Sequence, residues 1–204
     1  KRYISFIVAE RKPSSNLLFI FDTQTPAAYN FYAGGSFYAY FSGDKKYKYG
    51  NSKILSFQRP VVTGGYNAKN GEIQPLPGGT NFDERFRLFL DASTPMAHIS
   101  NDALVQLGGN KYIKKYPVLV IVGSQEYWSE QQIKIIKKYI LDGGLVYLSA
   151  REFGFGLLRF SHNGNTISHY RYLKNDPLYQ MLKQKYPSKI PSYELNKVAT
   201  FRHL

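Results

Sequence analysis

Residues 117–150 decide the fold, and they read PVLVIVGSQEYWSEQQIKIIKKYILDGGLVYLSA. The apolar run at 118–122 has the length of a strand and suits one that is buried on both faces, as in parallel sheets. Ser129 and Gln132 fit a capping box for a helix with isoleucines on one face and lysines on the other. A glycine pair ends this helix, and a second buried strand follows at 145–148. The stretch therefore predicts a strand–helix–strand unit of an α/β domain.

The chain before this unit shows the same alternation. Residues 17–21 form a continuous apolar run of strand length, which polar residues at 22–26 bring to an end. Residues 97–99 predict a short strand, and residues 100–109 predict a short capped helix that ends at a glycine pair. Buried strands that alternate with helices predict a doubly wound, mostly parallel α/β sheet flanked by helices.

Local composition predicts five further segments. Residues 2–10 alternate weakly and predict a leading strand, whereas the aromatic-rich residues 27–41 predict a loop with a short helix. Residues 53–62 read as extended, and residues 64–80 hold enough Gly, Pro and Asn to predict a long loop. Residues 81–92 predict a helix, because their phenylalanines fall on one side at helical spacing.

The C-terminal part has a different pattern. Residues 157–173 alternate and predict a hairpin around an Asn-Gly turn. Residues 176–185 predict a short capped helix. We therefore expect residues 1–156 to form the α/β domain and residues 157–204 to form a C-terminal extension. That extension would pack on the domain or serve as an interaction segment.

Composition narrows the class of protein. The chain has 204 residues, 43% hydrophobic and 16% aromatic, which is enough for a sizeable core without disulfides or metals. The absence of cysteine excludes disulfides, thiolate metal sites and cysteine nucleophiles. No apolar run approaches the roughly 20 residues that cross a bilayer. The chain begins with Lys1, so we expect a processed or trimmed piece of a larger protein, either secreted, surface-associated or cytoplasmic.

The net charge of +13 indicates an acidic partner such as nucleic acid, anionic lipid or an acidic glycan. The alternative is that lysine serves as the solubilising residue, and this is favoured because the lysines are spread along the chain. Residues 45–49 and 111–116 interleave lysines with tyrosines, as single-strand nucleic-acid surfaces do. A solvated face with amphipathic tyrosines explains the same pattern, so nucleic acid is not the expected partner.

Polar residues leave three predicted strands at their carboxyl ends, where open α/β sheets bind ligands. They lie at 22–25, at 124–126 and at Arg151 and Glu152. Neighbouring parallel strands would bring Glu126 and Glu152 together, and two close carboxylates bind a metal or divide acid and base roles. The alternative is that Glu126 caps the following helix or pairs with Arg151.

Two other chemistries are not favoured. Ser124 follows a strand, but its surroundings are not a nucleophile elbow, and His98 on a short strand fits a core histidine. The other three histidines lie in the C-terminal part, and no histidine pair has the helical spacing of a metal site. The glycine pairs form no phosphate loop or dinucleotide fingerprint.

Several short motifs, in one order, resemble the C-terminal region of the large subunit of N,N-dimethylformamidase. They are TQTPAAYN at 23–30, GGSFY at 34–38, SFQRP at 56–60, SNDAL at 100–104 and GSQEYWS at 123–129, the last followed by the isoleucine- and lysine-rich helix. The resemblance covers residues from about 16 to 154. It implies a class I glutamine-amidotransferase-like, flavodoxin-type fold.

The resemblance also implies a metal, since the family's amide hydrolase holds a mononuclear iron with two tyrosines and a glutamate. It places the glutamate at Glu126 and one tyrosine at Tyr29. The position of the second tyrosine is Val61 here, the histidine of the family's turn is Ser124, and the asparagine after the next strand is Glu152. These departures imply a degenerate site.

Together these observations predict a cleft at the carboxyl ends of the strands. Glu126 would be a metal ligand, Glu152 a ligand or a base, and Arg59 a contact to the substrate or an oxyanion. The expected substrate-binding residues are Tyr29, Asn30, Ser124, Tyr127 and Arg151. The expected function is a metal-assisted hydrolase of an amide-type bond with a degenerate site. The alternatives are a non-catalytic binding or scaffold domain of a larger protein, with a neighbouring domain or a second copy as partner, and a polyanion binder.

Overall fold

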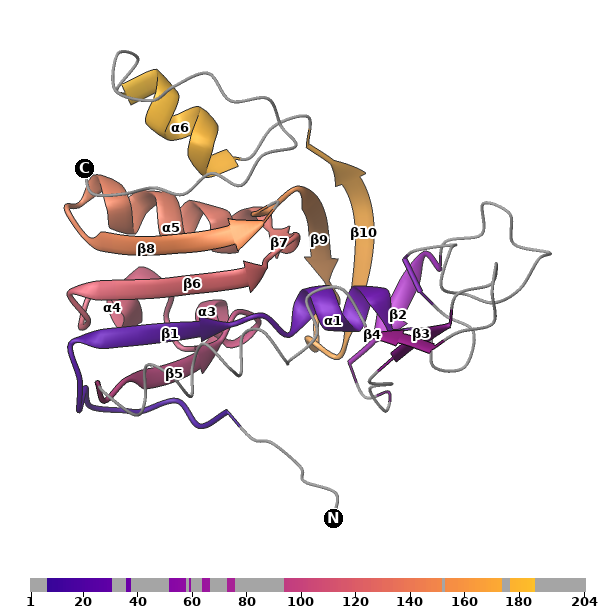
Figure 1. The fold of residues 1–204 in the computed structure, drawn as a ribbon, viewed down its shortest axis with the longest axis horizontal. Helices are drawn as coiled ribbons and strands as arrows, with labels where there is room; N and C mark the ends of the chain where they lie inside the picture. Colours follow the sequence, from indigo (N-terminus) through magenta and orange to yellow (C-terminus); the bar gives the residue numbers. More distant parts are fainter. Residues whose placement is uncertain are drawn as a thin grey trace.

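The computed structural model is built around a four-stranded parallel sheet in the order β5–β1–β6–β8 (Figure 1). Its strands are β5 (Ala97–Ser100), β1 (Leu17–Phe21), β6 (Val118–Ser124) and β8 (Leu145–Arg151). Every neighbouring pair is parallel, so the predicted parallel α/β sheet is confirmed. The structure describes residues 7–30, 36–37, 52–57, 59, 64–66, 73–75, 94–151, 153–173 and 177–185.

A second sheet has the order β2–β10–β9–β7. Its strands are β2 (Ile54–Ser56), β10 (Thr166–Tyr172), β9 (Gly156–Phe160) and β7 (Tyr127–Ser129). β9 and β10 form the predicted antiparallel hairpin, and β7 adds to β9 in parallel. The hairpin is thereby joined to residues that directly follow β6. The predicted division into domains near residue 156 remains a prediction.

Helices α3 (Ala103–Gln106), α4 (Asn110–Ile113) and α5 (Glu130–Leu141) contribute to one hydrophobic core with the parallel sheet. The capping box predicted for α5 is present: the Ser129 side chain accepts from the Gln132 backbone N–H, and the Gln132 side chain accepts from the Ser129 N–H. Helix α6 (Pro177–Lys185) packs near α5 and matches the predicted C-terminal helix. No helix in the described ranges is long and apolar enough to cross a membrane.

Both faces of the parallel sheet are buried at its centre. On β1, Leu18 and Ile20 belong to the core that includes α5, whereas Phe19 belongs to a second cluster on the opposite face. All three side chains are fully buried. Burial of each such side chain stabilises the fold by about 1.5–3 kcal/mol, which explains why the strand sequences are continuous apolar runs.

Two expectations were wrong. Residues 7–10 form no strand; this segment is held instead by contacts such as the hydrogen bond from the Tyr112 hydroxyl to the Glu10 carbonyl. The predicted loop at 64–80 contains β3 (Gly64–Tyr66) and β4 (Ile73–Pro75), which pair antiparallel. The prediction failed because β3 and β4 pair with each other over three residues each, and the composition of either segment alone does not reveal that pairing. The predicted helix at 81–92 lies outside the described residues.

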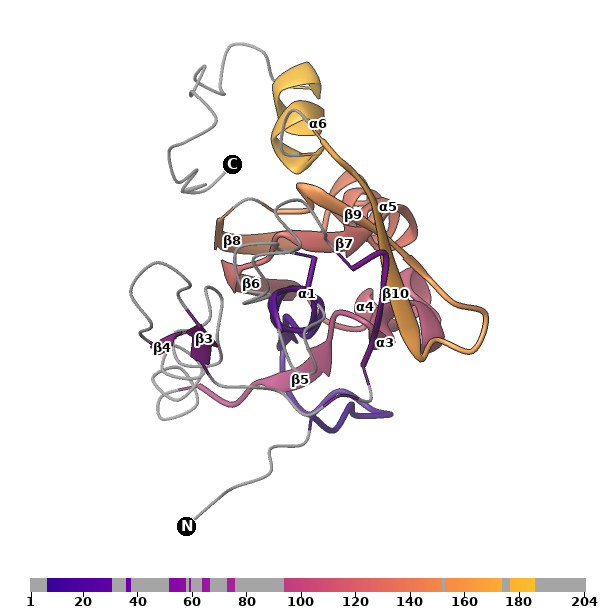
Figure 2. The same cartoon turned by 90° about the vertical axis from the view of Figure 1, so that its right-hand side faces the viewer.

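Helix α1 (Gln24–Tyr29) follows β1 at the carboxyl end of the parallel sheet. It lies beside both β7 and β2, so it contacts the second sheet (Figures 1 and 2). All six of its residues are buried. The short helix expected within 27–41 is only partly matched, because α1 begins at residue 24 in the polar stretch that ends the strand and reaches only residue 29. Residues 31–35 and 38–41 lie outside the described part of the chain.

Candidate functional site

The order of the parallel strands defines where a ligand would bind. From β1 the chain adds β5 on one side and β6 on the other, so the direction of strand addition reverses between β1 and β6. Open α/β sheets bind ligands in the crevice at the carboxyl ends of such strands, because the connections diverge there. α1 follows β1 at this point, and the turn of Gln125 and Glu126 follows β6.

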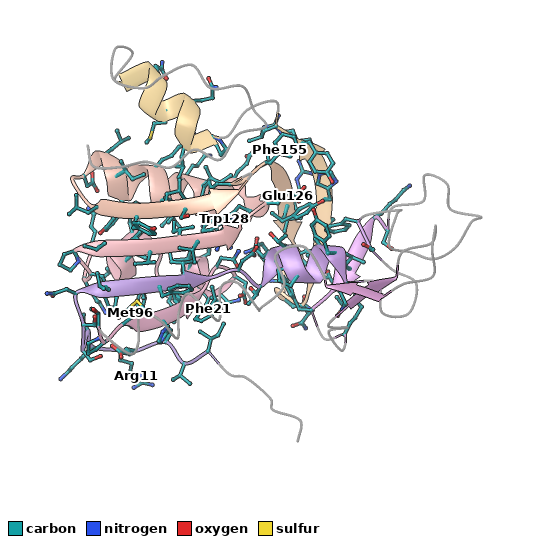
Figure 3. All side chains as sticks on the ribbon, viewed as in Figure 1. Arg11, Phe21, Met96, Glu126, Trp128 and Phe155 are labelled. Carbon is teal, nitrogen blue, oxygen red and sulfur yellow. The ribbon has the colours of Figure 1, made fainter. Side chains whose placement is uncertain are left out.

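Tyr29 and Glu126 meet at this point. The Tyr29 hydroxyl donates a hydrogen bond of 2.6 Å to the Glu126 Oε2. The exposed fraction is 6% for Tyr29 and 1% for Glu126, so the phenol and the carboxylate lie inside the protein. Figure 3 shows Glu126 near Phe155, where the two sheets adjoin. The structure therefore brings together the two residues that the resemblance had placed in one site.

The backbone around Glu126 is fixed on both sides. The Gln125 carbonyl accepts from the Gly154 N–H at 2.9 Å, and the Glu126 carbonyl accepts from the Gly156 N–H at 2.8 Å. The Gln125 side chain, which is fully buried, donates to the Val122 carbonyl. The first two bonds tie the turn to the segment that follows β8, and the third ties it to β6. The α5 cap is formed by Ser129 and Gln132, so Glu126 does not serve as the cap considered above.

Tyr127 links the turn to α1 and to the second sheet. Its N–H donates to the Thr25 Oγ1 at 3.1 Å, and its hydroxyl lies 2.6 Å from the Tyr172 hydroxyl. Its ring packs edge-on against the Tyr29 ring, with centroids 6.3 Å apart. Tyr127 is fully buried, so its side chain forms part of the wall of the site.

Arg59 and Asn30 lie against α1. The Arg59 Nη2 donates to the Ala27 carbonyl at 3.0 Å and its Nε donates to the Ser56 carbonyl, which connects α1 with β2. Partial burial lowers the pKa of Arg59 from its usual range. Asn30 is buried at the end of α1, and its N–H donates to the Pro26 carbonyl. Both residues support the helix that carries Tyr29.

The remaining predicted residues are only partly described. Ser124 and Arg151 are Cα partners at the carboxyl ends of β6 and β8. Their side chains, Glu152 and Val61 lie outside the described part of the chain. The predicted approach of Glu152 to Glu126 therefore remains a prediction.

Asp22 belongs to the polar strand end at 22–25 that the sequence marked, although it was not assigned a role in the site. Its Oδ1 accepts from the N–H groups of Gln24 and Thr25 and from the Asn101 Nδ2, all within 3.0 Å. Its Oδ2 is buried without a hydrogen-bond partner among the described residues. Burial raises the pKa of Asp22 to about 7, against the opposing effect of these hydrogen bonds. Its place as the first residue after a buried strand was the available signal.

His169 and Tyr172 of β10 were also missed, because the hairpin was interpreted as an extension. Their rings lie 4.2 Å apart, and the His169 ring lies 5.7 Å from that of Tyr127. The His169 Nε2 is buried and has no partner among the described residues. Burial lowers the pKa of His169. The alternation within 157–173 indicated which side chains face inward, but not which part of the fold they face.

The chemistry of the site is that of oxygen donors. A phenol and a carboxylate suit hard cations, so Tyr29 and Glu126 fit a metal such as the implied iron in the kind of ligand they offer. Within the described ranges, no three His, Cys, Asp or Glu side chains converge to hold a metal.

Fold and site thus define an α/β domain with a buried tyrosine–glutamate pair at the reversal of its parallel sheet. The family model described as N,N-dimethylformamidase beta subunit-like, C-terminal, matches residues 1–190. The chain belongs to this family. A comparison with curated proteins gives no match.

Proposed function

We propose that this domain is a metal-assisted hydrolase of an amide-type bond, with a site that is degenerate relative to its family. The observation that carries the proposal is the 2.6 Å contact between the Tyr29 hydroxyl and Glu126. It joins two oxygen donors inside the protein at the sheet position where α/β proteins bind ligands.

The strand order supports the finer fold assignment that accompanies this proposal. Numbered along the chain, the parallel strands follow the order 2-1-3-4, which is that of flavodoxin-type sheets. We accordingly propose a glutamine-amidotransferase-like arrangement. The membership of the chain in a beta subunit-like family supports a neighbouring domain or partner subunit as part of the functional protein.

In this proposal Tyr29 and Glu126 hold the metal. A metal ion bound there would supply Lewis-acid polarisation of a carbonyl and activation of water. Arg59 supports the site through α1, since its guanidinium donates to the Ala27 carbonyl. We expect activity on N,N-dimethylformamide itself to be lost, because Val61, Ser124 and Glu152 depart from the family pattern.

The second candidate is a non-catalytic binding or scaffold domain. It is favoured by the fact that Tyr29 and Glu126 already satisfy each other with a short hydrogen bond. A pair that needs no metal for its hydrogen bonding can persist after the loss of a metal site.

Metal uptake distinguishes the two candidates. The purified protein is titrated anaerobically with Fe(II), and bound metal is counted by elemental analysis. We expect about one equivalent in the native protein, and loss of binding in E126Q and Y29F. The matched controls are E130Q, which removes an exposed carboxylate, and Y112F, which removes a phenol hydroxyl remote from the site.

The two controls should retain the metal. Amine release from a panel of N-substituted amides then tests hydrolysis, with E126Q as the inactive reference. A native protein that takes up no Fe(II) would overturn the metal-assisted mechanism and leave the binding domain as the function.

A further inference from the structure

The position of α1 is set by contacts rather than by the helix itself. α1 has six residues, and isolated helices shorter than about 12–15 residues are marginal in water. Tyr29 is its last residue, so the place of the Tyr29 hydroxyl depends on whatever holds α1. Three groups of contacts link α1 to the strand ends and to the turn after β6, in addition to the hydrogen bonds from Arg59 to the Ala27 carbonyl and from the Phe37 N–H to the Ala28 carbonyl.

The first group anchors the start of α1 to the ends of two strands. Asp22 accepts hydrogen bonds from the N–H groups of Gln24 and Thr25, which lie in the first turn of α1. Asn101, which follows β5, donates from its Nδ2 to Asp22 and accepts from the Thr23 N–H. The free N–H groups of the helix are therefore satisfied by a carboxylate that is itself fixed.

The second group joins the same turn to the residue after Glu126. The Thr25 Oγ1 accepts from the Tyr127 N–H at 3.1 Å, and the Thr25 N–H donates to the Asp22 Oδ1 at 2.9 Å. Thr25 is fully buried. Asp22, Thr25 and the Tyr127 amide thus form a continuous connection from β1 to the turn after β6.

The third contact is the one between Tyr29 and Glu126. Thr25 and Tyr29 are four residues apart, so they lie on the same face of α1. That face meets two consecutive residues of the turn, Tyr127 through Thr25 and Glu126 through Tyr29. Loss of the first contact removes one of the two hydrogen bonds between this face and the turn, so we expect the second to weaken with it.

We propose that Thr25 and Asp22 are positioning residues that hold α1 so that the Tyr29 hydroxyl reaches Glu126. The positioning role itself does not depend on the proposed function. Only the statement that Tyr29 and Glu126 bind a metal or a substrate rests on the proposed function. It predicts that the contribution of Tyr29 to stability depends on the Thr25 hydroxyl, whether or not a metal binds.

A double-mutant cycle in urea tests this dependence. Y29F is made in the native protein, in T25V and in T25S, and the shift of the unfolding midpoint is compared. We expect the shift caused by Y29F to fall to less than about half in T25V, because the pair is already separated there. It should return to its native size in T25S, which keeps the hydroxyl. Equal shifts in all three backgrounds would overturn the proposal.

Metal affinity supplies a readout that a general loss of stability would not move. Folded T25V should bind Fe(II) about tenfold more weakly, the equivalent of one lost hydrogen bond, and T25S should bind as the native protein does. If the native protein binds no metal, the proposed function fails, while the cycle still decides the positioning role.

Should T25V not fold, D22A replaces it in the cycle, with D22N as the conservative partner. Equal Y29F shifts in D22A and D22N would then overturn the proposal.

Discussion

The two sheets bury aliphatic and aromatic side chains in different proportions. The parallel sheet packs mostly aliphatic residues such as Leu18, Ile99 and Ile121 against its helices, with the aromatic residues Tyr112, Tyr116, Trp128, Tyr139 and Phe153 among them. The second sheet packs against a cluster that includes Tyr29, Phe37 and Tyr127 together with leucine and isoleucine, and the His169 and Tyr172 rings lie next to it. Both cores place phenol hydroxyls inside the protein, and in the core of the parallel sheet the Tyr139 hydroxyl is satisfied by the Tyr116 and Pro117 carbonyls. The second cluster differs because its tyrosines lie beside the Glu126 carboxylate and the His169 ring.

The two regions also differ in the titratable group that each one buries. Asp22 lies at the end of the parallel sheet, and its pKa is raised to about 7. His169 lies in the second sheet, and its pKa is lowered. Each has one buried atom without a partner among the described residues. Burial favours the neutral form of each group, which is the protonated carboxyl of Asp22 and the unprotonated imidazole of His169. The stability contributed by Asp22 is therefore lost as the pH rises, whereas that contributed by His169 is lost as the pH falls.

The largest effect is expected from the scaffold. Ile121→Ala leaves a cavity where a fully buried side chain of β6 packed, so it should lower the free energy of unfolding by about 2–5 kcal/mol. Urea unfolding measures the change. Leu145→Ala, at an exposed position of β8, is the matched control and should cost about 0.5 kcal/mol or less. Similar changes in the free energy of unfolding for Ile121→Ala and Leu145→Ala would contradict the burial of Ile121 in the parallel sheet.

The second effect concerns Asp22. In the unfolded chain its pKa is near 3.8, so between pH 4 and 7 the folded protein holds more protons there than the unfolded one. The stability from this group is therefore full below pH 4 and is lost as the pH rises through about 7. The loss is a few kcal/mol, since one pKa unit is about 1.4 kcal/mol. Urea unfolding at pH 5 and pH 8 should show this loss in the native protein and a flatter profile in D22N.

The third effect tests the aromatic region directly. Tyr127→Phe removes one partner of the 2.6 Å contact with Tyr172 and should cost about 1 kcal/mol, the net value of one such hydrogen bond. Tyr172→Phe removes the other partner. If the bond carries the effect, the double substitution costs less than the sum of the two single ones. Full additivity would show that the two hydroxyls act through separate contacts.

The smallest effect is expected at His169. Because its folded pKa lies below its unfolded value of about 6.5, the stability from this group is present above pH 6.5 and is lost as the pH falls. His169→Phe keeps a ring in the cluster and removes the buried nitrogen. Stability at pH 8 should change by less than about 1 kcal/mol. Thermal unfolding of the His169→Phe variant at pH 5 and pH 8 should show a smaller loss of stability at acid pH than the native protein shows.

The parallel sheet was predictable because its signals are local and strong. The runs at 17–21 and 118–122 are continuous apolar segments of strand length, and the capping box at Ser129 and Gln132 fixes where α5 begins. Such features are independent of what the rest of the chain does. The predictions from them were confirmed within a few residues.

The second sheet was not predictable in the same way. β2 pairs with β10 although Leu55 and Ile167 are far apart in sequence, and β7 has only three residues. No local pattern says which distant strand a short segment will join. For the same reason Tyr29 could be nominated only through the resemblance, and His169 and Tyr172 went unnoticed. Glu126 and Asp22 were marked by a local signal, since each follows a buried strand.

The turn after β6 has a consequence for which sequence changes the protein tolerates. The carbonyls of Gln125 and Glu126 are both bound by N–H groups of glycines, and a side chain at Gly156 would collide with the Tyr127 ring at 2.6 Å. An inserted or deleted residue here would break both bonds at once, so length changes are excluded at the position nearest the candidate chemistry. A change of side chain that leaves both hydrogen bonds in place is the kind of change that this turn accommodates. The position of the Glu126 backbone is therefore set by main-chain hydrogen bonds rather than by the identity of the side chains around it.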